Sequence, residues 1–229
     1  MYKIAFFGAS VTYQKNGYSK YFAELNPNFS VRTFGYPGMR ISNAGVCCID
    51  EVMSFEPDYC FVDWLSPAYI GDSSFPVLKE YIDALLHRFF EKNVKLIFLI
   101  FPDTNPCKSN LYKEAKSYLE QLGVPIIDLM ASFADLSAII RDNVHTTSYG
   151  SDQYAKILSD RFLNKIFLNY EIPRSFPPKN KYCEIKSLDV DIDVFNRIFF
   201  CGQCEVVGIK HILGPHSGDI KVDGRMIRT

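Results

Sequence analysis

The stretch FFGASVT, residues 6–12, decides how this chain is interpreted. Apolar residues run from Ile4 to Phe7 and stop at a turn of small residues that carries one hydroxyl, Ser10. A helix-forming segment follows at 18–25. A strand, a tight glycine turn and an exposed serine form the geometry that presents a nucleophile at the carboxyl end of a parallel strand. The stretch lacks the G-x-S-x-G spacing of the α/β-hydrolase elbow, so an ordinary loop after a first strand is the competing interpretation.

Length and charge limit the classes of protein to which this chain can belong. The chain has 229 residues, enough for one α/β domain with a sizeable core and a small appendage. Its net charge is −1, with both signs interspersed along the sequence. We therefore expect neither a nucleic acid nor an anionic membrane as its partner. The longest apolar run, 94–101, is far too short to span a bilayer.

The expected compartment is the cytoplasm. Met1 leads almost directly into the first predicted strand, which leaves no room for a signal peptide. The seven cysteines are an odd number and show no framework spacing. Reduced thiols in a cytoplasm fit this pattern best.

Predicted strands and helices alternate through the first 168 residues. The expected strands are 2–7, 30–34, 59–64, 94–101 and 124–129, and the expected helices after 18–25 are 41–55, 75–92, 109–122 and 148–168. This alternation predicts a doubly wound parallel sheet of five strands with helices on both faces. The segment 94–101 is the most strand-like of the chain and is expected to be central in the sheet.

The pattern changes after the last predicted helix. Residues 171–181 contain three prolines and are typical of an extended linker. From Tyr182 onward, β-branched and aromatic runs are broken by turn signals, which predicts roughly five short strands joined as hairpins. We therefore expect an α/β domain over 1–169, a proline-rich linker over 170–181 and a small all-β appendage over 182–229.

A second chemical signal lies some 130 residues after Ser10, in the loop before the last predicted helix. Asp142 precedes His145 by three residues, so its carboxylate can accept from the imidazole Nδ1–H and leave Nε2 to take a proton from a serine. In a doubly wound sheet this loop opens on the same edge as Ser10. A lone loop histidine is more often a surface or capping residue, but its pairing with Ser10 favours catalysis.

These blocks resemble those of the SGNH (GDSL-like) hydrolase family. Residues 8–12 resemble its first block, usually Gly-Asp-Ser, and residues 35–39 resemble its second, whose glycine gives an oxyanion-hole amide. The sequence from Asp142 to His145 resembles its last block, followed by Gly150 and an alanine at the usual spacings. The resemblance covers about residues 1–168 and three of the four blocks.

The resemblance implies roles for individual residues. Ser10 would be the nucleophile, His145 the base and Asp142 the residue that orients it, with Gly38 as an oxyanion donor. It also implies a flavodoxin-like α/β/α sandwich, with the appendage outside it.

Two departures from the family pattern bear on the site. Ala9 stands where the family usually has aspartate. The third block normally ends in Gly-x-Asn-Asp with the asparagine as an oxyanion donor, whereas residues 62–68 contain no asparagine, and Pro67 has no amide hydrogen. One such donor is worth about 10²–10³ in rate. Ser66 is the candidate to replace it, and a loop that only shapes a pocket is the alternative.

No metal or cofactor is expected. Cys201 and Cys204, with His211 and His216, offer four possible zinc ligands. The Gly-Gln between the cysteines is equally typical of a hairpin turn, and the spacing matches no zinc finger. The sequence also contains no Walker A, G-x-G-x-x-G or HExxH motif.

These features predict a serine-dependent ester hydrolase that removes short acyl groups such as acetyl from a carbohydrate through an acyl-enzyme on Ser10. The expected partner is a small-molecule or glycan ester, and no oligomeric state is predicted. An O-acyltransferase on a glycan precursor is the first alternative, because a sugar hydroxyl can capture the same intermediate. A catalytically weak glycan-binding module is the second.

Overall fold

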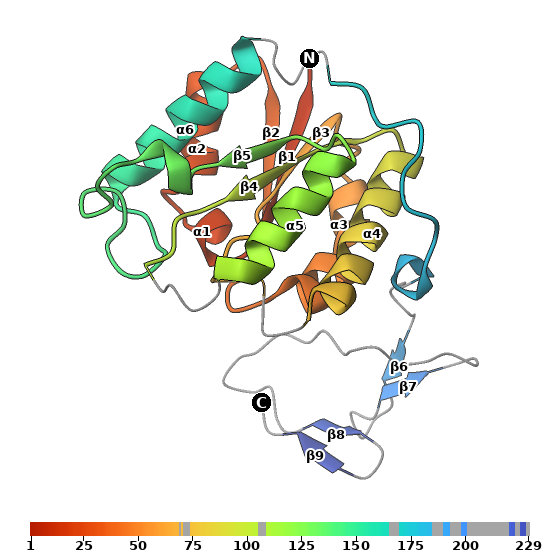
Figure 1. Cartoon of the computed structure of the whole chain (residues 1–229). Coiled ribbons are helices and arrows are strands. Elements are labelled where there is room, and N and C mark those ends of the chain that lie inside the picture. Colours follow the sequence, from red (N-terminus) through yellow and green to blue (C-terminus); the bar gives the residue numbers. More distant parts are fainter. Residues whose placement is uncertain are drawn as a thin grey trace. The chain divides into compact units, whose positions relative to one another are not determined.

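The computed structural model describes residues 1–68, 70, 74–104, 109–164, 170–184, 190–192, 198–200, 220–222 and 225–227. The chain divides into two compact units, Met1–Ser187 and Leu188–Thr229. Figure 1 shows the first as a sheet covered by helices and the second with the short strands β6 to β9.

The first unit is built on one five-stranded sheet. Its strands are β1 (Lys3–Gly8), β2 (Ser30–Gly35), β3 (Tyr59–Val62), β4 (Lys95–Ile100) and β5 (Ile126–Asp128). They follow the order β2-β1-β3-β4-β5, and every neighbouring pair is parallel. The predicted doubly wound sheet is therefore confirmed. The strand order reverses at β1, and the carboxyl ends beside such a switch point are where ligands bind in open α/β sheets.

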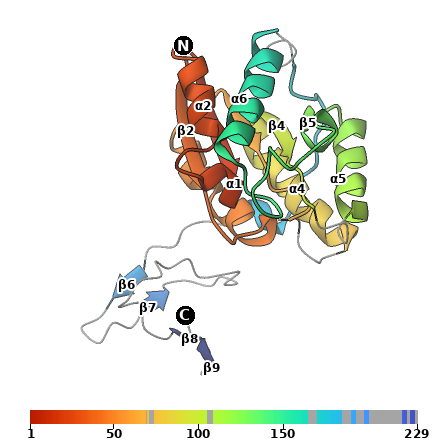
Figure 2. The same ribbon diagram turned by 90° about the vertical axis from the view of Figure 1, so that its left-hand side faces the viewer.

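Helices cover both faces of this sheet. They are α1 (Ser10–Tyr13), α2 (Tyr18–Leu25), α3 (Ile49–Met53), α4 (Phe75–Glu91), α5 (Ser109–Gln121) and α6 (Ser148–Leu163), with a π-helical turn η1 (Ile41–Gly45) and a 3₁₀ turn η3 (Met130–Ser132). Figure 2 shows α2 and α6 together on one face, and α4 and α5 on the other. None of the helices in the described part of the chain is long and apolar enough to cross a membrane.

The core explains why β1 is apolar from Ile4 to Phe7. Successive side chains of a strand point to opposite faces, so Phe6 and Phe7 enter different layers. Phe6 stacks on Phe61 with 5.0 Å between ring centroids and meets Phe22 of α2 edge-on at 5.2 Å. Phe7 faces Phe89 of α4 at 6.4 Å. The strand that carries Ser10 at its end is thus fixed from both sides.

The predicted helix over 41–55 is wrong as a single element, since η1 and α3 replace it. The Asn43 side-chain oxygen accepts from the backbone amides of Arg40 at 2.6 Å and Ala44 at 2.8 Å. These bonds are part of a capping box at the start of η1. The second element, α3, begins separately after Cys48, its N-cap residue.

Three other elements differ from the prediction, one in its place in the sheet, one in its length and one in being present at all. The strand predicted over 94–101 forms β4, which lies between β3 and β5, one place from the middle strand β3. The helix predicted to reach residue 168 ends at Leu163, and 165–169 lie outside the described residues. The sequence did not predict α1, which is only four residues long.

The predicted linker runs along α4. The Pro177 carbonyl lies 3.2 Å from His87 Nδ1, and the Asn180 side-chain amide donates to the Glu80 carbonyl at 2.8 Å. A 3₁₀ turn, η4 (Lys181–Glu184), follows within the same unit. The division between the units therefore falls after Ser187, later than the predicted appendage boundary at 182.

The described residues of the second unit form two antiparallel pairs of strands. β6 (Val190–Ile192) pairs with β7 (Ile198–Phe200), and β8 (Ile220–Val222) pairs with β9 (Arg225–Ile227). The all-β appendage over 182–229 stays a prediction. The cysteine and histidine residues considered as zinc ligands, at 201, 204, 211 and 216, lie outside the described residues.

Candidate active site

Ser10 is the first residue of α1, two residues beyond the last position of β1. The turn requires glycine at position 8, because a Cβ there would overlap the carboxylate of Asp63. The Ala9 carbonyl then accepts from the Tyr13 amide at 3.0 Å, which closes the short helix. These contacts place Ser10 at the carboxyl edge of the sheet, beside the switch point.

Asp142 organises the loop that carries His145. One carboxylate oxygen, Oδ1, accepts from the backbone amides of Val144 at 2.9 Å and His145 at 2.8 Å. Partial burial raises the pKa of this carboxyl, but the hydrogen bonds from these two amides and from the imidazole outweigh it and lower the pKa to about 2. Asp142 is therefore ionised at neutral pH.

A continuous chain of hydrogen bonds joins Asp142, His145 and Ser10. His145 Nδ1 lies 2.9 Å from Asp142 Oδ2, and His145 Nε2 lies 2.9 Å from Ser10 Oγ. An ionised carboxylate can only accept, so the proton of the neutral imidazole is on Nδ1. Nε2 is then left to accept from the serine hydroxyl. The fold thus brings three of the five predicted site residues together, although Ser10 and His145 are 135 positions apart in the sequence.

Gln14 connects the two loops that carry these residues. Its side-chain amide nitrogen donates to the Thr146 carbonyl at 3.2 Å, and its oxygen accepts from the Thr146 hydroxyl at 2.9 Å. The loop is anchored from the other side, where the Thr147 amide donates to the Ile139 carbonyl at 2.9 Å. Gly150 is needed at the start of α6 because a Cβ there would overlap that same carbonyl.

Asp63 is a residue of the site that the sequence analysis did not identify. It follows β3, its side chain is fully buried, and its Oδ1 accepts from the Ala9 amide at 2.8 Å. Its Oδ2 accepts from the Thr12 hydroxyl at 2.6 Å. Burial raises the pKa of this carboxyl to about 7, although the hydrogen bonds from Thr12 and Ala9 act in the opposite direction. Asp63 therefore holds the backbone on both sides of Ser10.

One sequence signal pointed to Asp63. It is the single charged residue in the otherwise apolar run 59–65. A charged side chain is almost never fully buried unless it has partners, so its position in a buried strand predicts a bonded role. The partners, Ala9 and Thr12, lie more than 50 residues earlier, and only the parallel pairing of β1 with β3 brings them together.

The two predicted oxyanion residues lie in loops at the same edge of the sheet. Gly38 follows β2 and has a φ of +72°, which favours glycine. Ser66 follows β3 and is buried, and its Oγ accepts from the Phe101 amide at 2.9 Å. The Ser66 hydroxyl thus links the loops after β3 and β4 and retains its own proton to donate. The oxyanion roles of both residues stay predictions.

Comparison with known proteins gives a clear result only for structure. No family model and no curated protein matches the sequence.

Within the described residues, no group of three or more histidine, cysteine or acidic side chains is arranged to hold a metal ion.

Solved structures of esterases are similar to this chain. A two-domain esterase active on acetylated mannans has a TM-score of 0.62 and 17% identity, over 84% of this chain and 58% of that one. An acetyl xylan esterase, AlAXEase, has a TM-score of 0.56 and 16% identity, over 72% of this chain and 100% of that one. A GDSL-like lipase from Bacteroides thetaiotaomicron VPI-5482 has a TM-score of 0.54 and 13% identity, over 71% and 88%. The α/β body of this chain therefore has the fold of the GDSL-like hydrolases, as the resemblance of its sequence blocks predicted.

Proposed function

We propose that this protein is a serine-dependent ester hydrolase that removes short acyl groups, such as acetyl, from a carbohydrate. The observation that carries the proposal is the hydrogen-bonded chain from Asp142 through His145 to Ser10, with both contacts of the imidazole at 2.9 Å. A hydroxyl, a neutral imidazole and an ionised carboxylate in this order are the components of an activated serine nucleophile.

In the first half of the reaction, Ser10 Oγ attacks the acyl carbon while His145 Nε2 takes the hydroxyl proton. The ionised Asp142 stabilises the imidazolium that forms, and its low pKa keeps it from taking the proton itself. The bond between the acyl carbon and the sugar oxygen then breaks. The imidazolium gives its proton to that oxygen, which leaves as a sugar hydroxyl, and the acyl group stays on Ser10.

In the second half, water replaces the sugar. His145 Nε2 takes a proton from the water as its oxygen attacks the acyl carbon, and then returns the proton to Ser10 Oγ when the acid leaves. The amides of Ser10 and Gly38, with the hydroxyl of Ser66, are the proposed donors to the oxyanion in both halves. A hydroxyl is less fixed in direction than an asparagine amide, so we expect a modest catalyst.

Two relatives in structure support the choice of substrate. One is an acetyl xylan esterase and another is an esterase active on acetylated mannans, and both share the fold of this chain. Both names describe a substrate in which acetyl groups are attached to a carbohydrate. We therefore assign a carbohydrate ester as the substrate class.

The proposal is tested by the release of acetate from acetylated xylan and acetylated mannan fragments. Ser10→Ala is the inactive variant, and Ser175→Ala, at an exposed position in the segment along α4, is the matched control. We expect the wild-type protein and the control to release acetate and Ser10→Ala to release none. Acetate release that survives in Ser10→Ala would refute the nucleophile assignment. Acetyl recovered on an added sugar acceptor instead of as free acetate would change the reaction from hydrolysis to transfer.

A further inference from the structure

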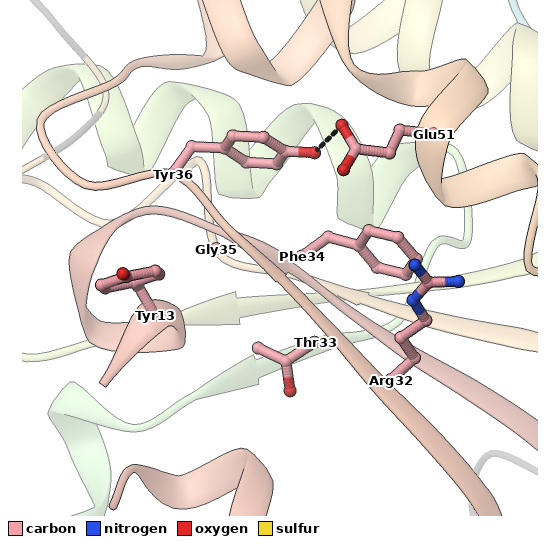
Figure 3. Close-up of a pocket in the computed structure, with 7 residues that line it drawn as sticks. All are labelled: Tyr13, Arg32, Thr33, Phe34, Gly35, Tyr36 and Glu51. Atoms are coloured by element: carbon pink, nitrogen blue, oxygen red, sulfur yellow. Dashed lines mark hydrogen bonds between the residues drawn. The ribbon is translucent and has the colours of Figure 1, made fainter. Parts of the chain in front are cut away.

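A hollow of about 290 Å³ is lined by residues that include Tyr13 of α1 but none of the proposed catalytic residues. Figure 3 shows its walls, which are formed by Tyr13, Arg32, Thr33, Phe34, Gly35, Tyr36 and Glu51. They come from α1, from β2 and the turn after it, and from the segment that includes α3. Aromatic rings, one guanidinium and one carboxylate thus surround a single space.

The hollow begins one helical turn from the nucleophile. Tyr13 ends the helix that Ser10 begins, so the two are separated by about 4.5 Å of helical rise. α1 packs directly on the edge strand β2 here, because a Cβ at Gly35 would overlap the Tyr13 backbone. Ser10 and the hollow thus lie at the two ends of one short helix.

The aromatic walls differ in how firmly they are held. Tyr36 lies 6.4 Å from the buried Trp64 with nearly parallel rings and meets Phe7 edge-on at 6.0 Å. Its hydroxyl donates to Glu51 Oε2 at 2.8 Å. Tyr13, by contrast, is 62% exposed. The hollow thus has one fixed ring and one ring that is open to a ligand.

The charges of the hollow balance. Arg32 is exposed, its guanidinium lies 5.0 Å from the centre of the Phe34 ring, and it forms no ion pair with any residue that the structure describes. Glu51 supplies the single opposite charge. One positive and one negative group give the hollow no net attraction for an ion. Guanidinium donors and carboxylate acceptors between aromatic faces suit a molecule with several hydroxyls and apolar ring edges.

We propose that this hollow binds a neutral sugar ring of the substrate while its acyl group lies at Ser10. The inference rests on the proposed function and specifies where the sugar is held. Arg32 donates to ring hydroxyls, Glu51 accepts from them, and Tyr13 covers one face of the ring. These residues determine specificity and take no part in the transfer of the proton.

The test compares a sugar ester with an ester that has no sugar. For each variant, kcat/KM is measured on acetylated xylan or mannan fragments and on 4-nitrophenyl acetate, and the ratio of the two values is the readout. We expect Arg32→Ala and Tyr13→Ala to lower this ratio at least 10-fold, mainly through KM for the sugar ester. Arg174→Ala, at an exposed position along α4, should keep the wild-type ratio, and Tyr13→Phe, which retains the ring, should restore most of it.

The other outcomes overturn the inference and leave the proposed function standing. An unchanged ratio in Arg32→Ala and Tyr13→Ala would show that the hollow does not hold the sugar. A preference for acetylated uronic acids that Arg32→Ala abolishes would show an anionic ligand instead. Failure of the proposed function itself is recognised separately, because Ser10→Ala would then retain its activity on both esters.

Discussion

The buried carboxyl of Asp63 gives the protein a predictable dependence of stability on pH. Its pKa in the folded state is about 7, against an ordinary value of 3.8. Between these two pH values the folded protein retains a proton that the unfolded chain has lost. The stabilisation from this group is therefore complete below pH 3.8 and is lost as the pH rises through 7.

The size of the effect follows from the shift. One retained proton changes the free energy of unfolding by about 1.4 kcal/mol per pH unit inside the window. With a pKa of about 7 for Asp63, the wild-type protein should lose about 2.5 kcal/mol of stability between pH 5 and pH 8 through this group. Asp63→Asn has no proton to exchange and should lack this slope.

The assay is urea unfolding of the wild-type protein and Asp63→Asn at several pH values from 5 to 8. The difference between their free energies of unfolding isolates Asp63, because all other titrating groups are shared. We expect that difference to move by about 2.5 kcal/mol in favour of the variant as the pH rises to 8. Asp160→Asn, which removes an exposed carboxylate of α6, is the control for the change from a carboxyl to an amide. A difference for Asp63→Asn that stays constant with pH would refute the reasoning.

Three further predictions concern the frame of the site and its boundary. Gly8→Ala should fail to give soluble protein or should lower Tm by many degrees, because its Cβ would overlap the Asp63 carboxylate; a Tm near that of the wild-type protein would contradict this contact. Gln14→Ala should lower kcat on 4-nitrophenyl acetate about 10-fold with little loss of Tm, because it releases the loop of His145 from the helix of Ser10; an unchanged kcat would show that the bridge is not needed. A chain ending at Ser187 should keep the wild-type kcat on the same ester, because the contacts divide there, and loss of activity from a soluble truncated chain would count against this boundary.

Much of the fold could be predicted because its longer elements repeat a clear pattern. The helix α4 has its apolar residues at helical spacing, and β4 is a run of apolar residues. The segment 41–55 has the same spacing, but it forms a π-helical turn over 41–45 and a separate helix over 49–53. The four residues of α1 are too few for any periodicity to show, so this helix could be found only in three dimensions.

Some contacts of the site lie within one short motif, and others form only when distant segments of the chain pack together. Asp142 and His145 are three residues apart, and their contact is local, so the sequence predicts it. The bonds from Asp63 to the turn at Ala9, and from the Phe101 amide to Ser66, join segments that are 54 and 35 residues apart. Such contacts depend on strand order and register, which no local pattern specifies.

The central claim is that His145 activates Ser10 as a nucleophile. The most direct measurement is the rate and position of labelling by a fluorophosphonate, with the modified peptide identified by mass spectrometry. We expect a single label on Ser10 in the wild-type protein, none in Ser10→Ala, and a rate at least 100-fold lower in His145→Ala, because general-base assistance contributes about 10²–10⁴. A label on another residue, or an equal rate of labelling in His145→Ala, would contradict the account.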